Sequence, residues 1–193
     1  MIIHRWLPAS IMFLASVLAT RAVAQSLPRV MIQTELGSME VEVDTIGNPD
    51  AAASFLSDVD QGVFQGARFD RTVRAERLPG GKSEIEGIRG GLNPSRPKDV
   101  APKALERKKD TGLALGDKAL SVPEDGPDAS SSEFFIRAGD HPELGRLDSD
   151  GQRFTPFGRV VRGREVVRLI HTARARDHRL TPPIGILEIE RVR

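Results

Sequence analysis

The chain contains no cysteine and only one tryptophan, Trp6, and aromatic residues make up only 5% of it. Without cysteine it can form no disulfide, so its folding does not depend on oxidation, and it has no thiol for a lipid anchor. A chain of 193 residues can nevertheless bury most of its apolar surface in one compact domain without covalent links. We therefore expect a single domain that is stabilised by its hydrophobic core.

The N-terminus predicts a secretory signal peptide. A histidine and an arginine precede an apolar run at residues 11–19, which ends near Ala22-Val23-Ala24. The run is too short to span a membrane, which takes about 20 apolar residues, and the small residues after it suit a signal peptidase. We therefore expect residues 1–24 to be cleaved and residues 25–193 to form a periplasmic or secreted domain without a stable membrane anchor. An uncleaved anchor and an ordinary buried helix are the alternatives.

An excess of charge of one sign is also absent. The chain has 28 Lys and Arg against 27 Asp and Glu. Loss of residues 1–24, which hold Arg5 and Arg21, leaves 28 − 2 = 26 cations and a net charge of −1. Trp6 is lost with the same segment. Balanced charge offers no electrostatic footprint for nucleic acid, so we expect no nucleic-acid partner.

Motifs for metals and cofactors are missing as well. His141, His171 and His178 lack the close spacing of zinc ligands. No Gly-rich phosphate loop lies between a predicted strand and a predicted helix. We therefore expect neither a metal nor a cofactor.

Hydrophobic periodicity predicts a mainly β fold with two helices. Asn48 offers a cap and Pro49 a first-turn residue for a helix that ends at Gly62. A second helix is expected over residues 164–171, with its apolar face formed by Val166, Val167, Leu169 and Ile170. Short strands with two helices predict a closed eight-stranded antiparallel β-barrel capped by two α-helices. The expected strands cover residues 30–34, 39–43, 67–73, 84–89, 112–115, 119–122, 134–138, 155–161 and 186–192, and the first two are expected to form a β-hairpin.

Two strings of residues resemble the cyclophilin family of peptidyl-prolyl isomerases. Phe69-Asp70-Arg71 is similar to the family's Phe-x-Arg, and Gly126-Pro127-Asp128-Ala129-Ser130-Ser131-Ser132-Glu133-Phe134-Phe135-Ile136 is similar to its pocket loop and strand. The likeness covers nearly all of residues 29–193. It implies a cofactor-free peptidyl-prolyl cis-trans isomerase that acts on proline-containing, unfolded or partly folded polypeptides. Together with the signal peptide, it implies a role in the folding of exported proteins.

The resemblance also implies the residues of the site. Arg71 would be the catalytic residue, because rotation about an X-Pro bond gives the amide nitrogen a lone pair that a fixed cationic donor can bind. The planar ground state offers no such acceptor, so this contact favours the transition state. The implied substrate-binding residues are Phe69, Arg89, Glu124, Glu133, Phe135, Leu144 and Phe154.

The chain departs from the family near this site. Where the family usually has Phe-Met-x-Gln-Gly-Gly, it reads Glu86-Gly87-Ile88-Arg89-Gly90-Gly91. Two apolar pocket walls and a positioning glutamine are thereby replaced. Arg89 could form an ion pair with Glu133 or compete with Arg71 for acidic partners. These departures favour an alternative function, a catalytically weak cyclophilin-like module that binds peptides or acts as a chaperone; an unrelated ligand-carrying barrel is a third hypothesis.

Overall fold

The computed structural model describes residues 26–74, 86–91, 93, 119–123, 133–139 and 154–192. Its elements are β1 (Arg29–Thr34), β2 (Gly37–Val43), α1 (Pro49–Asp60), β3 (Arg68–Val73), β4 (Gly87–Gly90), β5 (Ala119–Pro123), β6 (Phe134–Arg137), β7 (Phe154–Arg162), α2 (Arg164–Thr172), β8 (Ala175–Arg176) and β9 (Arg179–Arg191). The expected strand at 112–115 lies outside the described residues.

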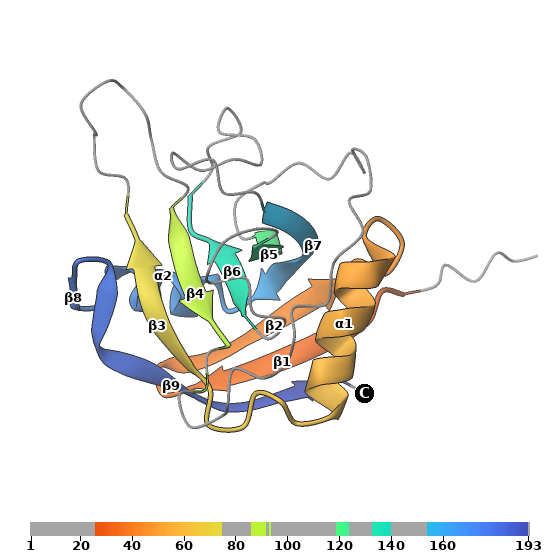
Figure 1. Cartoon of the computed structure of the whole chain (residues 1–193), viewed down its shortest axis with the longest axis horizontal. Helices are drawn as coiled ribbons and strands as arrows, with labels where there is room; N and C mark the ends of the chain where they lie inside the picture. The colour runs from red at the N-terminus through yellow and green to blue at the C-terminus, as the bar shows by residue number, and fades with distance from the viewer. Residues whose placement is uncertain are drawn as a thin grey trace, which may run out of the picture.

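The strands form a closed antiparallel barrel (Figure 1). Within the described residues the sheet has nine strands in the order β1-β2-β7-β5-β6-β4-β3-β9-β8, and β1 also pairs with β9. That additional pairing closes eight strands into a ring and leaves the two-residue strand β8 outside it, paired only with β9. The predicted fold class is therefore confirmed, as is the opening hairpin, in which β1 pairs with β2.

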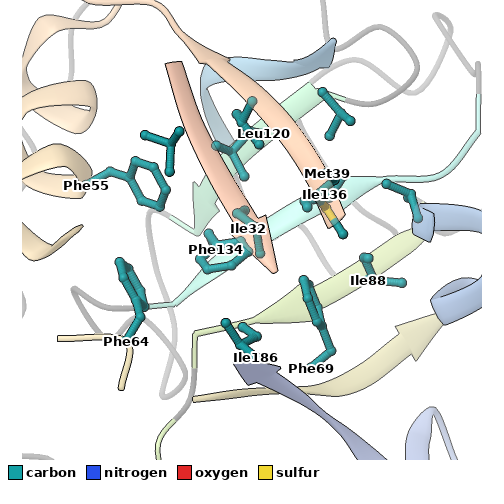
Figure 2. Packing of buried hydrophobic residues seen from close by; sticks show 14 of the residues in the cluster. Ile32, Met39, Phe55, Phe64, Phe69, Ile88, Leu120, Phe134, Ile136 and Ile186 are labelled. Atoms are coloured by element: carbon teal, nitrogen blue, oxygen red, sulfur yellow. The ribbon is translucent and has the colours of Figure 1, made fainter. Parts of the chain in front are cut away.

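Phenylalanine rings from α1, from the turn that follows it and from strands of the sheet fill the barrel (Figure 2). The ring of Phe134 lies 5.9 Å from Phe55, 5.7 Å from Phe64 and 5.8 Å from Phe69 between centroids, in edge-to-face arrangements. This geometry is the favourable one for aromatic pairs. Phe134 is 1% exposed. It therefore joins α1 to β3 and β6 at the centre of the core.

The two helices pack on different strands and contribute to the same core. α1 contacts β7 and β9, whereas α2 contacts β2, β3 and β4. In α2, Val166, Val167 and Ile170 are buried, but Leu169 is 48% exposed. The prediction that Leu169 belongs to the apolar face is therefore wrong, because the buried face of this short helix is filled by the other three residues. No described helix is long and apolar enough to cross a membrane.

The start of α1 differs from the expected cap. Pro49 occupies the first turn, as predicted, but the Asn48 side chain makes no capping hydrogen bond. Instead, its Nδ2 donates to the carbonyl oxygen of Pro156 in β7. The amide thus fixes the helix to the barrel, a tertiary role that local sequence does not reveal. The helix ends before Gly62, which has a φ of 63° that glycine adopts without strain.

The last strand begins seven residues earlier than expected, at Arg179 instead of residue 186. The intervening Pro182 and Pro183 cannot donate to a strand ladder, which is why the sequence predicts no strand there. Asp177 and His178 both have positive φ and form the turn between β8 and β9. Residues 175–180 therefore form a short hairpin that the sequence analysis did not predict.

An ion pair between Asp60 and Arg191 links the end of α1 to the end of β9. Nε and Nη2 of Arg191 each lie 2.6 Å from the Asp60 carboxylate. This hydrogen bonding from Arg191 lowers the pKa of Asp60 below its usual 3.8. A group whose folded pKa is lowered stabilises the fold above its unfolded pKa, and this contribution is lost as the pH falls through the folded pKa.

We expect an NMR titration to place the pKa of Asp60 below 3.8. Arg191→Gln should move that pKa back toward its ordinary value, because the charged donor is removed. Identical Asp60 titrations in the variant and the unmodified protein would contradict this assignment.

Candidate active site

Strand register brings Arg71 into line with Phe135. Arg71 in β3 lies opposite Arg89 in β4, which in turn lies opposite Phe135 in β6. Residues directly opposite in an antiparallel pair project from the same face of the sheet. Their neighbours Thr72 and Ile88 are 1% and 0% exposed and point into the barrel. Arg71, Arg89 and Phe135 therefore share the outer face.

An irregularity in the pairing of β3 with β9 separates Phe69 from Arg71. Strand alternation would place these two residues on one face, but the pairing with β9 shifts register between them. Phe69 is 0% exposed and belongs to the core cluster with Phe134; Figure 2 shows both rings inside the barrel. The structure thus does not bring the Phe69 side chain together with Arg71 on the outer face.

A small apolar patch lies beside the arginines on the outer face. Phe135 and Phe154 form a cluster separate from the barrel core, and Val73 packs against it. The two ring centroids are 4.9 Å apart. Two of the residues implied to bind substrate, Phe135 and Phe154, are therefore in contact. Val73 was not predicted from the sequence, although its position two residues after Arg71 on the same strand places it on the same face.

Gly87 makes room for the ring of Phe135. A Cβ at Gly87 would lie 2.4 Å from Cζ of Phe135 and 2.5 Å from the carbonyl oxygen of Ile136. Any larger residue at this position would have to displace the ring or the neighbouring strand. The glycine that departs from the family pattern therefore lets Phe135 lie directly against β4.

Arg89 is held between two carboxylates. Its Nε and Nη2 donate to Asp70 at 3.3 and 2.8 Å, and its Nη1 lies 3.7 Å from Glu133. The side chains of Arg89 and Asp70 are each 17% exposed and that of Glu133 is 6% exposed. The ion pair with Glu133 confirms one of the two possibilities for Arg89. The contact with Asp70 was not predicted, because it depends on the register between β3 and β4.

The C-terminal end of α2 and the following hairpin fix the residue next to Arg71. The hydroxyl of Thr72 donates to the carbonyl oxygen of His171 at 2.9 Å. Its backbone N–H donates to the carbonyl oxygen of His178 at 2.8 Å. A ring nitrogen of His171 lies 2.9 Å from the carbonyl oxygen of Val73. Contacts with α2 and with the β8–β9 turn thus hold β3 at Thr72 and Val73, which limits the movement of the Arg71 backbone.

Two of the implied site residues, Glu124 and Leu144, lie outside the described residues. The remaining ones fall into two groups: Arg71, Arg89, Glu133, Phe135 and Phe154 gather at the outer face, and Phe69 lies in the core. Among the described residues, no cluster of His, Asp and Glu could hold a metal ion. The arrangement combines a half-buried guanidinium with an apolar patch, a combination that can bind a ring and donate a hydrogen bond beside it.

Comparisons with known proteins point to one family. A family model described as cyclophilin type peptidyl-prolyl cis-trans isomerase/CLD matches residues 29–191. The peptidyl-prolyl cis-trans isomerase CYP18-2 of Arabidopsis thaliana is 33% identical over 143 residues, which cover 73% of this chain and 79% of the relative. A peptidyl-prolyl cis-trans isomerase of Acinetobacter baylyi is 26% identical over 147 residues, 75% of this chain and 73% of the relative.

A solved structure shares the fold. The cyclophilin type peptidyl-prolyl cis-trans isomerase of Cryptosporidium parvum, crystallised in the presence of the dipeptide Ala-Pro, superimposes with a TM-score of 0.64 at 20% identity. The match covers 86% of this chain and 99% of the solved chain. At this identity the similarity shows a common barrel architecture.

Proposed function

Because the chain belongs to the cyclophilin-type peptidyl-prolyl cis-trans isomerase family, and is therefore an isomerase of X-Pro bonds, we propose that Arg71 catalyses this reaction on proline-containing segments of exported proteins. The observation that carries the proposal is the cross-strand row Arg71, Arg89, Phe135. It places a guanidinium and an apolar patch side by side on the outer face. The structural relative crystallised with Ala-Pro supports a proline-containing substrate.

The proposed chemistry requires only a ring-binding surface and a fixed donor. The proline ring lies against Phe135 and Phe154, while the carbonyl that precedes it rotates. In the twisted amide the proline nitrogen regains its lone pair and accepts a hydrogen bond from Arg71. Since the planar amide has no such lone pair, the bond forms only near the transition state and lowers the barrier.

The hydrogen bond from Arg71 cannot account for the whole rate acceleration. An acceleration of about 10⁵-fold requires about 7 kcal/mol, whereas one charge-assisted hydrogen bond contributes about 1.5–3 kcal/mol. The apolar patch supplies the remainder by orienting the ring and by excluding water, which strengthens the field of the guanidinium. Both parts of the site are therefore needed.

In this proposal Arg89 is a positioning residue. Its guanidinium pairs with both Asp70 and Glu133, so it offsets one of their two negative charges within the site. This bridge ties Asp70 of β3 to Glu133, which directly precedes β6. It takes the place of the glutamine that the family usually has at this position.

The changes around Gly87 and Arg89 favour one second candidate, a module that binds proline-containing peptides but isomerises them weakly. The ring of Phe135 lies against Gly87, where the family usually has a further apolar side chain. A proline ring would then have a smaller apolar surface to pack against. Binding would persist while the acceleration fell.

The deciding experiment is two-dimensional exchange NMR on a short Ala-Pro peptide with catalytic amounts of the protein. Uncatalysed isomerisation takes tens of seconds, so cross-peaks between the cis and trans forms at sub-second mixing times show catalysis. Exchange at the rate of an added inert protein would contradict the proposal. Peptide line-broadening without exchange would then favour the binding module.

The proposed site of action outside the cytoplasm is supported by the predicted signal peptide. Expression of the full chain in a Gram-negative host should yield a periplasmic protein whose N-terminus begins near residue 25. Recovery of an uncleaved chain from the cytoplasmic fraction would contradict this part of the proposal and leave the isomerase activity unaffected.

A further inference from the structure

Four arginines lie in register across four neighbouring strands. Arg176 in β8 lies opposite Arg179 in β9, Arg179 lies opposite Arg71 in β3, and Arg71 lies opposite Arg89 in β4. Paired residues project from the same face, so these four residues form one row on the outer face, here called the arginine row. Figure 1 shows β8 at the far end of this series, with β9, β3 and β4 following in order.

The two ends of the arginine row differ in their charge partners. At one end, Arg89 is neutralised by Asp70 and Glu133. At the other end, Arg176 and Arg179 are both exposed, and no ion pair joins either of them to a carboxylate within the described residues. Asp177 is the nearest carboxylate in sequence, but it lies in the turn between them and pairs with neither.

Like charges directly opposite each other on neighbouring strands destabilise a sheet. The arginine row contains three such pairs in succession; Arg89 has two carboxylate partners, and within the described residues no ion pair offsets the charge of Arg176 or Arg179. An arrangement that costs stability and leaves two guanidinium groups exposed is typical of a surface that binds an anion. Arginine is well suited to this, because its planar fork matches the two oxygens of a carboxylate.

The arginine row continues directly into the site. Beyond Arg89 the same register leads to Phe135, so a ligand that touches both ends must contain an apolar ring and an anion in one chain. We propose that the row selects substrates in which an acidic residue flanks the proline, a specificity that rests on the isomerase function proposed above. An acidic polypeptide fits this continuity better than a lipid surface does, because it can place a proline and a carboxylate on one extended backbone.

Strand spacing sets the expected separation. Neighbouring strands lie about 4.8 Å apart, so Arg179 is about 14 Å from Phe135 along the row. An extended peptide advances about 3.3 Å per residue, and this distance therefore corresponds to about four residues. A flexible arginine side chain spans part of this distance itself, so fewer peptide residues are needed between the proline and the acidic residue. The acidic residue should lie about two to four residues from the proline.

The test uses peptide pairs that differ only in Glu or Gln, placed two, three or four residues before or after an Ala-Pro bond. The unmodified protein should show a kcat/KM about 3- to 10-fold higher for Glu than for Gln at the best position, as expected for exposed ion pairs. The ratio should fall toward one between about 0.01 and about 1 M salt, because the Debye length falls from about 30 to about 3 Å.

The variant Arg176→Gln/Arg179→Gln should bring the ratio close to one at low salt. The matched control is Arg164→Gln/Arg168→Gln, which removes the same charge from exposed positions of α2 that lie outside the row. The control should keep the ratio of the unmodified protein. An equal fall of the ratio in both double variants would overturn the proposal, because net charge alone would then explain it.

Failure of the arginine row and failure of the isomerase function are separable. If no peptide is isomerised, the proposed function fails. Fluorescence anisotropy of labelled Glu and Gln peptides still tests whether the arginine row prefers an acidic residue. A Glu preference that Arg176→Gln/Arg179→Gln abolishes supports it. Equal binding of both peptides, with binding of phosphatidylserine vesicles that depends on Arg176 and Arg179, would overturn the peptide assignment in favour of a membrane surface.

Discussion

Replacement of Arg71 by alanine should lower kcat/KM for an Ala-Pro peptide about 100-fold. The estimate follows from the loss of one hydrogen bond that forms only in the transition state, which contributes about 1.5–3 kcal/mol. Because the planar substrate does not receive this bond, kcat should fall with kcat/KM while KM changes little. Exchange NMR at several peptide concentrations measures both constants.

Two further variants make this result specific. Arg71→Lys keeps the positive charge but loses the planar fork, so its activity should lie between those of the unmodified protein and the alanine variant. Arg68→Ala removes another half-buried arginine of β3, which pairs with Gly185 outside the site. Its kcat/KM should equal that of the unmodified protein. Equal activities for Arg71→Ala and Arg68→Ala would show that Arg71 is not the catalytic group.

Replacement of Phe134 by alanine should destabilise the fold by about 3–5 kcal/mol, as expected for a fully buried phenylalanine. Its ring contacts Phe55, Phe64 and Phe69 in the barrel, and side chains around such a deletion relax only partly into the cavity that it leaves. Urea unfolding followed by circular dichroism measures the change, with the slope compared between proteins to check two-state behaviour.

The adjacent Phe135 provides the matched comparison. It lies on the outer face with a ring contact to Phe154, so Phe135→Ala should cost less stability than Phe134→Ala. Its kcat/KM should nevertheless fall at least about tenfold, because the proline ring loses its wall. Phe134→Ala, assayed under conditions where it is folded, should retain more activity. The reverse order of either quantity would contradict the assignment of the two rings to opposite faces.

The structure explains which parts of the fold are readable from sequence. The opening hairpin and both helices follow from local periodicity and from glycine and proline positions, and they lie where expected to within a few residues. The hairpin of β8 and β9 was missed, because the two prolines in β9 hide a strand that neighbouring strands support. Local signals fail where tertiary contacts stabilise an element that they disfavour.

The site residues show the same difference between what local sequence reveals and what tertiary contacts decide. The strings around Arg71 and Phe135 point to a common surface, and the register confirms that these two residues share one row. Phe69 lies in the core instead, because the alternation of inward and outward residues in β3 is broken between Phe69 and Arg71, where the pairing with β9 shifts register. Such an irregularity leaves no clear mark in the sequence.

By itself the sequence determined the barrel class and supplied the two strings from which the proposed site follows, since both depend on residues close together along the chain. Only the tertiary structure decided which charges meet. Asp70 and Glu133 pair with Arg89 through the register of β3, β4 and β6, and Arg176 and Arg179 come into line with Arg71 through the pairing of β8, β9 and β3. Strand register depends on contacts between distant segments, so no local pattern of residues specifies it.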